Sequence, residues 1–429
     1  MEMKLSLALM MTLIACGQIE GSMEMMNPAG DPASIAIINV ASMGAVGDCA
    51  TDDTKAIQAA VATAAMHGGG TVFVPKGCYL INAVPQGIAL ESNISLRLDD
   101  GAIFQTITND AIAYSLIQIA NKTNVNISGG VLIGDRTTHT GTGGEWGFGI
   151  SILSSSHVTI EDVVTRDFWG DGIYVGQLTG KDNPPAKDIV LRGCVADNNR
   201  RQGLSLISVS GAVIDDCTFR NTHGTAPEAG VDLEPNLNNT VENVLIKNCL
   251  FDKNTQGVQL AGGAGWIHRN QILNNRMTNN TRDGIHIDHA DVNNYFSNNI
   301  IQGNQDNGLY VAYANSNFFT ENSIQDNGHN GIIIGRSSNN VFSKNYISGN
   351  AVSKISILFG SKYNYVQGNI CQKGTGMNMT QYGIHIGPDE LDGTACQSNM
   401  IISNDLKNSG DKMLLYDQGK NTVLLDNEL

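Results

Sequence analysis

Gly284-Ile285-His286-Ile287 is one of ten copies of the short motif that decides the fold of this chain. Each copy places a variable residue between two aliphatic ones. Because side chains alternate between the two faces of a strand, the motif predicts a short strand with both aliphatic residues buried. The copies are Gly149-Ile-Ser-Ile, Gly172-Ile-Tyr-Val, Gly203-Leu-Ser-Leu, Gly230-Val-Asp-Leu, Gly257-Val-Gln-Leu, Gly284-Ile-His-Ile, Gly308-Leu-Tyr-Val, Gly331-Ile-Ile-Ile, Ile355-Ser-Ile and Gly383-Ile-His-Ile.

A second column of small residues recurs between these strands, at separations of 23 to 32 residues. Repeats of this length predict a solenoid in which each repeat is one coil stacked on the next. We therefore expect an all-β fold, a right-handed parallel β-helix of about ten coils. The column consists of Cys194, Cys217, Cys249, Asn275, Asn299, Asn322, Asn345 and Asn369.

The asparagines of this column are expected to stack into an internal ladder, in which each side chain satisfies backbone groups of neighbouring coils. Three stacked thiols can in principle bind a metal ion. We interpret Cys194, Cys217 and Cys249 instead as packing residues, because a free cysteine behaves as a small buried hydrophobe.

Composition and charge narrow the class of protein. Charged residues make up 16% of the chain and aromatic residues 6%, and there are 48 glycines, which suits many short strands joined by turns. The formal net charge is −15. A general nucleic-acid partner is therefore not expected, because binding to phosphate backbones depends on lysine and arginine.

The first residues predict where the protein is located rather than how it folds. Lys4 precedes a short apolar run, as in a signal peptide, and the run is too short to span a bilayer. Its end resembles a bacterial lipobox, which implies cleavage and lipidation at Cys16. Residues 17–32 are then a tether. We expect an exported protein that meets the membrane only through a lipid anchor in the cell envelope, or that is secreted.

Residues 40–81 form a distinct unit before the coils. Asp52 or Asp53 can cap a helix of about three turns, and Ile57 and Val61 fall on its apolar face. The glycine triplet that begins at Gly68 ends this helix. A strand over residues 71–74 follows.

This unit resembles the N-terminal segment of the pectate-lyase-like superfamily, of the rhamnogalacturonase and epimerase type. The resemblance implies that the helix covers the open end of the β-helix. It divides the chain into a cap with the first coils at residues 33–100 and the β-helix proper at residues 101–429. Cys49 and Cys78 flank the capping segment and can pair, since export permits disulfides.

The variable position of the motif should point away from the core and form a stripe with one residue per coil, about 4.8 Å apart. The densest chemistry lies in residues 230–236 and 282–289. The stripe reads Ser151, Tyr174, Ser205, Asp232, Gln259, His286, Tyr310, Ile333, Ser356 and His385.

Arginines border this stripe in a chain that has only 26 lysines and arginines. Arg200, Arg201 and Arg282 end the turns that precede motif strands. Cations beside carboxylates, histidine and tyrosine suggest an anionic polysaccharide as the substrate. The alternative for Arg200 and Arg201 is that they are ordinary solvated residues of a turn. The expected substrate-binding residues are Arg200, Arg282, Asp288, Gln259 and Tyr310.

Asp232 and Glu234 lie two residues apart on one strand face, so their carboxylates should be about 6–7 Å apart. That spacing suits inverting glycoside hydrolysis, in which a water lies between acid and base. It equally suits a Ca²⁺ site completed by Asn236, or a solvated acidic pair.

His286 suggests a different reaction. β-Elimination or C5-epimerisation of a uronate requires a base, an acid and a cation that neutralises the substrate carboxylate. His286 can be the base, Tyr174 or Tyr310 the acid, and Arg201 or Arg282 the cation. The alternative is that His286 is an ordinary surface residue.

The Gly230–Glu234 strand is loosely similar to the outward Asp/His strand of mannuronan C5-epimerases. Glu234 stands where those enzymes have histidine, and Ala229 where they have tyrosine, so the epimerase catalytic set does not transfer intact. Polygalacturonase motifs and the pectate-lyase arginine signature are absent from the sequence.

The leading hypothesis is an exported enzyme that acts on an acidic polysaccharide by uronate β-elimination or C5-epimerisation. Its catalytic residues would be His286, Tyr174, Asp232, Glu234 and Arg201, with Ca²⁺ at Asp232 and Glu234 in one version. One alternative is a glycoside hydrolase that uses Asp232 and Glu234. The other is a non-catalytic carbohydrate-binding protein of the cell surface, because polar stripes also arise on regular β-helices without catalysis.

Overall fold

The computed structural model describes residues 37–180, 182–263, 265–290, 292–374, 382–388 and 393–429. The predicted signal peptide, the lipidation site Cys16 and the tether at residues 17–32 lie outside these residues and stay predictions. The predicted cap and the predicted coils belong to a single compact unit.

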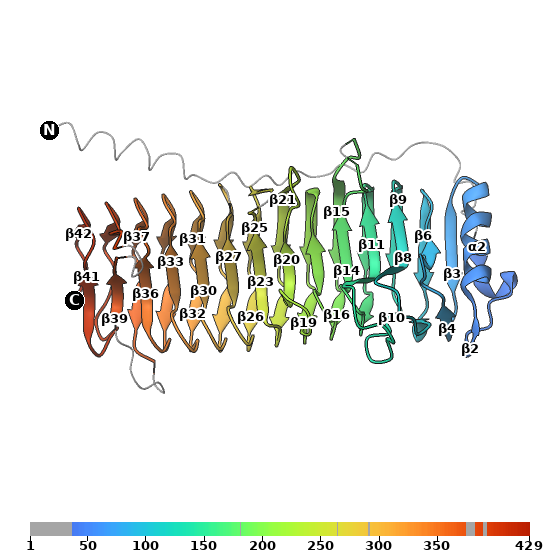
Figure 1. Cartoon of the computed structure of the whole chain (residues 1–429), viewed down its shortest axis with the longest axis horizontal. Coiled ribbons are helices and arrows are strands. Elements are labelled where there is room, and N and C mark those ends of the chain that lie inside the picture. Colours follow the sequence, from blue (N-terminus) through green and yellow to red (C-terminus); the bar gives the residue numbers. More distant parts are fainter. Residues whose placement is uncertain (1–36, 181, 264, 291, 375–381, 389–392) are drawn as a thin grey trace. The chain divides into compact units, whose positions relative to one another are not determined.

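Three parallel sheets run side by side along the coils, from the blue end to the red end in Figure 1. We name them sheet A, with sixteen strands, and sheets B and C, with thirteen strands each. Sheet A begins at β1 (Ile37–Asn39) and ends at β42 (Val423–Leu425), and sheet B runs from β2 (Asp48–Asp52) to β38 (Ile370–Gln372). All pairs are parallel, so the fold is the right-handed parallel β-helix that the motif predicts.

The motif copies build sheet C, where both aliphatic residues of each copy are buried. Sheet C also holds β5 (Ile88–Ala89), β8 (Ala113–Ala120) and β41 (Met413–Asp417), which lack the motif; the expected number of about ten coils was therefore low. The motif strands are β11 (Trp146–Leu153), β14 (Ile173–Gly176), β17 (Leu204–Leu206), β20 (Ala229–Leu233), β23 (Gln256–Ala261), β27 (Ile285–Asp288), β30 (Leu309–Ala312), β33 (Ile332–Gly335), β36 (Ser353–Leu358) and β39 (Tyr382–Ile386).

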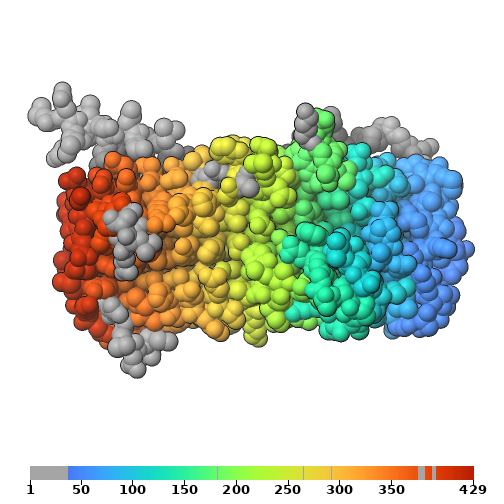
Figure 2. Space-filling view, viewed as in Figure 1, coloured from blue at the N-terminus to red at the C-terminus, as the bar shows by residue number. Residues whose placement is uncertain are grey.

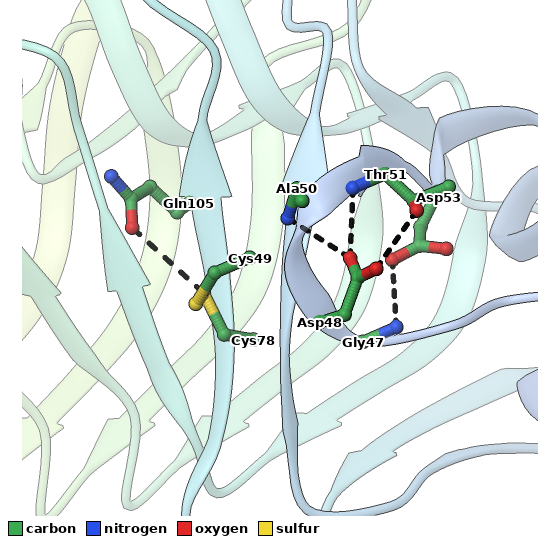
Figure 3. Close-up of a disulfide and its surroundings, with 8 residues drawn as sticks. All are labelled: Gly47, Asp48, Cys49, Ala50, Thr51, Asp53, Cys78 and Gln105. Carbon is green, nitrogen blue, oxygen red and sulfur yellow. Dashed lines mark hydrogen bonds between the residues drawn. A yellow bond between two sulfur atoms is a disulfide. The ribbon is translucent and has the colours of Figure 1, made fainter.

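Helix α2 (Thr54–Met66) covers the N-terminal end of the coils, as the resemblance implied (Figure 1). Ile57 and Val61 are fully buried on its inner face. Asp53 is the N-cap residue but makes no side-chain cap hydrogen bond, and Asp52 before it accepts a hydrogen bond from the Thr54 N–H at 3.0 Å. Asp53 has a different task, because its carboxylate accepts the N–H groups of Val46 and Gly47 in the preceding loop (Figure 3 shows the Gly47 bond).

A disulfide joins Cys49 to Cys78 beside this cap, as the sequence suggested (Figure 3). It connects β2 to β4 (Gly77–Ile81), which are neighbours in sheet B. The carboxylate of Asp48 accepts hydrogen bonds from the backbone of Ala50 and Thr51, which folds the short segment that holds Cys49.

Asparagine ladders occupy three corners of the coils, where the sequence predicted one. In the predicted ladder, Asn322 accepts hydrogen bonds from the backbone and side-chain N–H groups of Asn299, each at 3.0 Å. It donates to the Phe296 carbonyl at 2.9 Å and to Asn345 at 3.0 Å. Two further ladders run through Asn270, Asn294, Asn317, Asn340, Asn364 and Asn399, and through Asn254, Asn280, Asn304, Asn327 and Asn350.

The interior between the sheets is apolar. Phe296, Phe319 and Phe342 stack in successive coils, with neighbouring ring centroids 4.7 Å apart. Cys194, Cys217 and Cys249 are buried in the same core, which confirms that they are packing residues.

Within the described part of the chain, no helix combines the length and the apolar character that a bilayer crossing requires.

Replacing Asn322 by alanine tests the ladder. The substitution removes the side-chain acceptor of the buried Asn299 N–H and the side-chain donor to the Phe296 carbonyl, so we expect the free energy of unfolding to fall by about 2 to 4 kcal/mol. Equilibrium urea unfolding measures it. The control is Asn126→Ala on the exposed face of β9 (Thr123–Ser128), which should change stability by less than about 0.5 kcal/mol. Equal effects of the two variants would contradict the ladder's role.

Candidate functional site

The stripe predicted from the motif is in register on sheet C. Tyr174 pairs with Ser205, Ser205 with Asp232, and Asp232 with Gln259. Gln259 in turn pairs with His286, and His286 with Tyr310. Two strand spacings, about 10 Å, therefore separate Asp232 from His286. The stripe contains two distinct groups of residues, one around Asp232 and one around His286.

The stripe is not exposed along its whole length, which corrects the expectation of a surface column. Ser151, Ser205, Asp232 and Ser356 are each at most 2% exposed. The physical reason at Asp232 is that long side chains from the turn before β17, in the neighbouring coil, cover it. Gln202 donates a hydrogen bond to Asp232 at 3.0 Å, and the Arg201 guanidinium lies among the neighbouring carboxylates.

The first group is an acidic cluster of Glu145, Asp171, Asp232 and Glu234 around Arg201. The guanidinium lies 3.2 Å from Asp171, 3.2 Å from Glu234 and 3.9 Å from Glu145, and the side chain is only 11% exposed. Burial alone would lower the pKa of Arg201, but the four carboxyl groups outweigh it and raise that pKa. Arg201 is therefore committed to these carboxyl groups and is not a free cation for a substrate.

Asp171 is the best-anchored member of the acidic cluster. Its carboxylate accepts hydrogen bonds from Arg201 at 3.2 Å and from the Ser205 hydroxyl at 2.8 Å. Burial raises the pKa of Asp171 to about 6, against the lowering effect of Arg201 and Ser205. Tyr174 lies beside it, and burial together with the charge of Asp171 raises the pKa of Tyr174 to about 12.

Asp232 is completely buried, and its Oδ1 atom has no hydrogen-bond partner among the described residues. Burial raises the pKa of Asp232 well above its ordinary value, and the charge of Glu234 and a hydrogen bond with Glu234 raise it further. The carboxyl group of Glu234 therefore acts on Asp232 electrostatically, and Glu234 itself lies 3.2 Å from Arg201. The expected separation of about 6–7 Å between the two carboxylates stays a prediction.

The residues proposed for Ca²⁺ do not converge. Asn236 is exposed and lines a separate cavity, to which neither Asp232 nor Glu234 contributes. Arg201 already supplies a positive charge beside both carboxyl groups. Among the residues described here, no three His, Cys, Asp or Glu side chains are grouped as a metal site requires. Calcium binding stays a prediction that this arrangement does not favour.

The second group is built on His286. Its Nδ1 lies 2.8 Å from Asp283 Oδ2, and its ring stacks on Tyr310 with centroids 4.6 Å apart. Asp288, two residues along the same strand, does not contact His286 in this way; its Oδ1 lies 2.8 Å from His289 Nδ1. Asp283 is held in turn by the backbone and side-chain N–H groups of Asn307, each at 3.0 Å.

This contact fixes the orientation of the imidazole. A carboxylate at Nδ1 favours the proton there and leaves the Nε2 lone pair outward. The His286 side chain is 18% exposed, so Nε2 is accessible from the stripe. Arg282 is exposed at the same coil, and its side chain makes no hydrogen bond or ion pair with the described residues. Asp283, His286, Tyr310 and Arg282 form what we name the histidine group.

Asp171, Gln202 and Asp283 were missed in the sequence, although they share a signal. Each directly precedes the glycine of a motif copy, and this position is polar and buried in most coils of sheet C. It forms a column beside the stripe in which Gln202 accepts the Ala229 N–H and Gln256 accepts the Asp283 N–H. The column reads Asp171, Gln202, Ala229, Gln256, Asp283, Asn307 and Asn330.

Glu145 was also missed, because it enters the acidic cluster on a loop whose shape the motif does not predict. The loop at residues 134–145 follows β10 (Val131–Ile133) and extends over later coils. Arg136 anchors it by donating to the carbonyls of Asn198 and His223, each at 2.7 Å.

Arg200 holds the same loop rather than facing the stripe. It lies over the Trp169 ring at 3.8 Å and donates to the Gly144 carbonyl at 2.9 Å. On the same Trp169 ring stacks His139, whose Nδ1 lies 2.9 Å from Asp135. Through these contacts Arg200 holds the loop in place. The sequence predicted a role in substrate binding for Arg200 and not this structural role.

Two family models match the chain. The model described as "Right handed beta helix region" matches residues 68–243, and the one described as "Periplasmic copper-binding protein (NosD)" matches residues 197–374. Each match covers one part of the solenoid, and together they span the acidic cluster and the histidine group.

Two curated relatives each match less than half of the chain. Uncharacterized protein YclG of Bacillus subtilis is 34% identical over 220 residues, which are 46% of this chain and 38% of YclG. Mannuronan C5-epimerase AlgE1 of Azotobacter vinelandii is 29% identical over 229 residues, which are 45% of this chain and 16% of that enzyme. The chain thus spans well under two thirds of the length of either relative.

Among solved structures, the A-module of mannuronan C-5 epimerase AlgE4 from Azotobacter vinelandii has the same fold. The TM-score is 0.63 and the sequence identity 19%, with 90% of this chain and 99% of the module covered. At this identity the likeness concerns the fold.

Asp171→Asn tests the buried acidic cluster through pH. In the unfolded chain Asp171 loses its proton near pH 3.8, whereas in the folded chain its pKa is about 6. Between these two pH values Asp171 is ionised in the unfolded chain but still protonated in the folded chain. Rising pH therefore stabilises the unfolded state, and the free energy of unfolding of the wild type falls. We expect the wild type to lose about 3 kcal/mol relative to the variant over this window.

Urea unfolding from pH 4 to 7 measures this difference. The control is Asp100→Asn in an exposed turn, which should follow the slope of the wild type. A constant gap between wild type and Asp171→Asn across the window would contradict the burial of an ionisable Asp171.

Proposed function

Because this chain is a right-handed parallel β-helix of the pectate-lyase-like superfamily, we propose that it is an exported carbohydrate-active enzyme. Its substrate would be an acidic polysaccharide, and its reaction β-elimination or C5-epimerisation of uronate residues. The observation that carries the proposal is the Asp283–His286 contact of 2.8 Å, with an accessible Nε2 beside the exposed Arg282. The similarity to AlgE1, whose name gives mannuronan as its substrate, supports the choice of a uronate polymer.

The first step of the proposed reaction removes the proton at C5 of a uronate. His286 Nε2 accepts this proton, while Asp283 keeps the imidazole oriented and stabilises the imidazolium that forms. Arg282 neutralises the substrate carboxylate, which lowers the free energy of the carbanion. This assignment moves the cation from Arg201 to Arg282, because Arg201 is already bound by carboxylates.

The second step donates a proton, and Tyr310 is placed for it by its stacking on His286. Burial raises the pKa of Tyr310, as do the charges of Asp288 and Asp283, so the phenol stays protonated. In elimination the electron pair left at C5 forms the C4–C5 double bond as the O4 leaving group departs with the tyrosine proton. In epimerisation a proton returns to the opposite face of C5 instead.

Export is part of the proposal. The disulfide between Cys49 and Cys78 supports it, because disulfides persist in oxidising compartments. We also propose that Cys16 is lipidated and that the protein is located in the bacterial cell envelope. We propose no copper chemistry from the NosD match, since the buried thiols of Cys194, Cys217 and Cys249 lie in the apolar core and the described residues form no group of metal ligands.

Glycoside hydrolysis is the second candidate, and the acidic cluster favours it. The raised pKa of Asp232 keeps this carboxyl group protonated beside Glu234, which is the pairing that a general acid needs. The complete burial of Asp232 weighs against this candidate, because a general acid must reach the glycosidic oxygen of the substrate. The hydrolase would release new reducing ends without an unsaturated product, and it would depend on Asp232 rather than on His286.

His286→Ala tests the proposed reaction. Loss of the base should lower turnover by about 10²- to 10⁴-fold, and Asp283→Asn should also lower it because the wrong imidazole tautomer is then favoured. Alginate, polygalacturonate and hyaluronan are the substrates. Ultraviolet absorbance detects the unsaturated product, and proton NMR detects a changed epimer ratio.

The matched control is His385→Ala, which changes the same stripe position four strands further along sheet C and should retain activity. If no substrate yields an unsaturated product or a changed epimer ratio, the proposed reaction is wrong. If new reducing ends appear and Asp232→Asn removes them while His286→Ala does not, the enzyme is the hydrolase.

A further inference from the structure

The outward face of sheet A changes character along the solenoid. In the last six strands of this sheet, the first and third residues point outward. We name these outward side chains the late face; they belong to the coils coloured orange to red at the left-hand end of the molecule (Figure 2). The strands are β28 (Tyr295–Ser297), β31 (Phe318–Thr320), β34 (Val341–Ser343), β37 (Tyr365–Gln367), β40 (Met400–Ile402) and β42.

The late face consists of two columns, because the six strands pair in register. The first column is aromatic or aliphatic throughout, the second holds hydroxyl, amide and aliphatic side chains, and neither contains a charged residue. The first reads Tyr295, Phe318, Val341, Tyr365, Met400 and Val423, and the second reads Ser297, Thr320, Ser343, Gln367, Ile402 and Leu425.

Earlier strands of sheet A carry charges at the position of the second column. Glu161, Arg192, Asp215 and Lys247 occupy it in four successive strands and alternate in sign. Arg192 lies 2.8 Å from Glu161, and Lys247 lies 3.3 Å from Asp215. Charges of this kind are typical of a sheet face that stays in water. Their replacement by uncharged residues after Lys247 indicates that the late face is covered by a partner.

The first column presents apolar surface to that partner. Tyr295 and Val423, at its two ends, are each 43% exposed, and the four residues between them are half-buried. The rings of Tyr295 and Phe318 stack with centroids 4.6 Å apart, which holds both side chains in place. A contiguous apolar surface of this kind is typical of protein–protein contacts.

Charge favours a second copy of the chain as this partner. The formal net charge of −15 makes two copies repel each other, so a contact between them is feasible where it adds no like-charge pairs. The two uncharged columns meet this condition. A partner of different sequence is usually selected and oriented through complementary charges, which these columns do not offer.

The residue order of the first column is complementary to its own reverse. Sheets that pack face to face lie about 10 Å apart with nearly aligned strands. A two-fold axis parallel to the strands and midway between β34 and β37 reverses the order of the coils and opposes the two first columns. Each aromatic residue then meets an aliphatic residue of the other copy: Tyr295 meets Val423, Phe318 meets Met400, and Tyr365 meets Val341.

The second column fits the same axis. Ser297 then meets Leu425, Thr320 meets Ile402, and Ser343 meets Gln367, so a smaller side chain faces a larger one each time. Close packing across an interface requires this alternation of size. A two-fold axis along the solenoid would instead oppose the apolar first column to the more polar second column, which forfeits contact between apolar surfaces.

We propose that the late face of sheet A binds the late face of a second copy, with the two solenoids antiparallel. Two columns of six residues from each copy form the contact, fewer than the about 20–30 residues a side of a standard interface, so the dimer is reversible. The contact uses sheet A and leaves the stripe on sheet C uncovered. It therefore does not depend on the reaction proposed for that stripe.

Sedimentation velocity on the full chain, over about a hundredfold range of protein concentration, tests the dimer. We expect a monomer–dimer equilibrium. Phe318→Glu brings a carboxylate against Met400 of the other copy, twice in each dimer, and should raise the dissociation constant at least about tenfold. Met400→Glu should act in the same way from the opposite side of the axis.

Val213→Glu is the matched control. Val213 lies in the same column of sheet A on β18 (Val209–Asp215), three strands before the late face begins, and its side chain is also half-buried. This variant should dissociate within about twofold of the wild type. Thermal unfolding of each variant verifies that it is folded.

Cysteine cross-linking tests the antiparallel order. Thr320→Cys and Ile402→Cys are made in separate chains that also carry Cys16→Ser, and the free cysteines of the described residues are buried. Mild oxidation of the mixed variants should give a covalent dimer, whereas neither variant alone should. The reason is that each position lies three strand spacings, about 14 Å, from its own equivalent across the axis.

The inference is wrong if the chain stays monomeric over the whole range, or if both glutamate variants of the late face associate as the wild type does. A monomeric chain whose binding to alginate is weakened by Phe318→Glu would show that a polysaccharide, and not a second copy, covers the late face. Covalent dimers from one cysteine variant alone, and none from the mixture, would reject the antiparallel order.

Discussion

Parallel pairing between successive coils is the constraint on which the rest of the structure depends. Each strand must satisfy its backbone groups with the coil before and the coil after, so every coil repeats the register of its neighbours. A residue type that appears at one position of the period then appears as a continuous column. The asparagine ladders, the stacked phenylalanines and the polar stripe are all consequences of this one register.

Columns of identical groups are stable only when their polar atoms can bond along the column. Asparagine meets this requirement because its amide is donor and acceptor at once, so a buried ladder of any length satisfies itself. Carboxylates cannot do so, since they only accept. Asp171, Asp232 and Glu234 therefore need Arg201 among them, and the pKa values of Asp171 and Asp232 rise because one guanidinium does not fully replace the lost solvent. The acidic cluster is therefore a place where stacked polar groups do not satisfy one another along the column and need a group of opposite charge among them.

Connections of unequal length between strands add features that the regular columns lack. The loop at residues 134–145 brings Glu145 to Arg201, and a cavity is lined by Gln177, Asn183 and Ser208 from two neighbouring connections and by Asn236 from a third. The solenoid is thus a rigid scaffold of regular coils, and its irregular connections supply the shape that a particular polysaccharide would require.

The amino-acid sequence by itself determined the fold, the register of the stripe and one of the three asparagine columns together with its cysteines. These follow from periodicity, because one aliphatic pair per coil admits a single arrangement in which the core is buried and the strands pair. The capping helix was implied by a family resemblance, and the cysteine pair by its position beside that helix. Tertiary structure decided which stripe residues reach a ligand. Arg201 and Gln202 bury Asp232, and Asp283 rather than Asp288 orients His286. The physical reason is that side-chain partners depend on rotamers and on loops that cross between coils, and neither is encoded in the period.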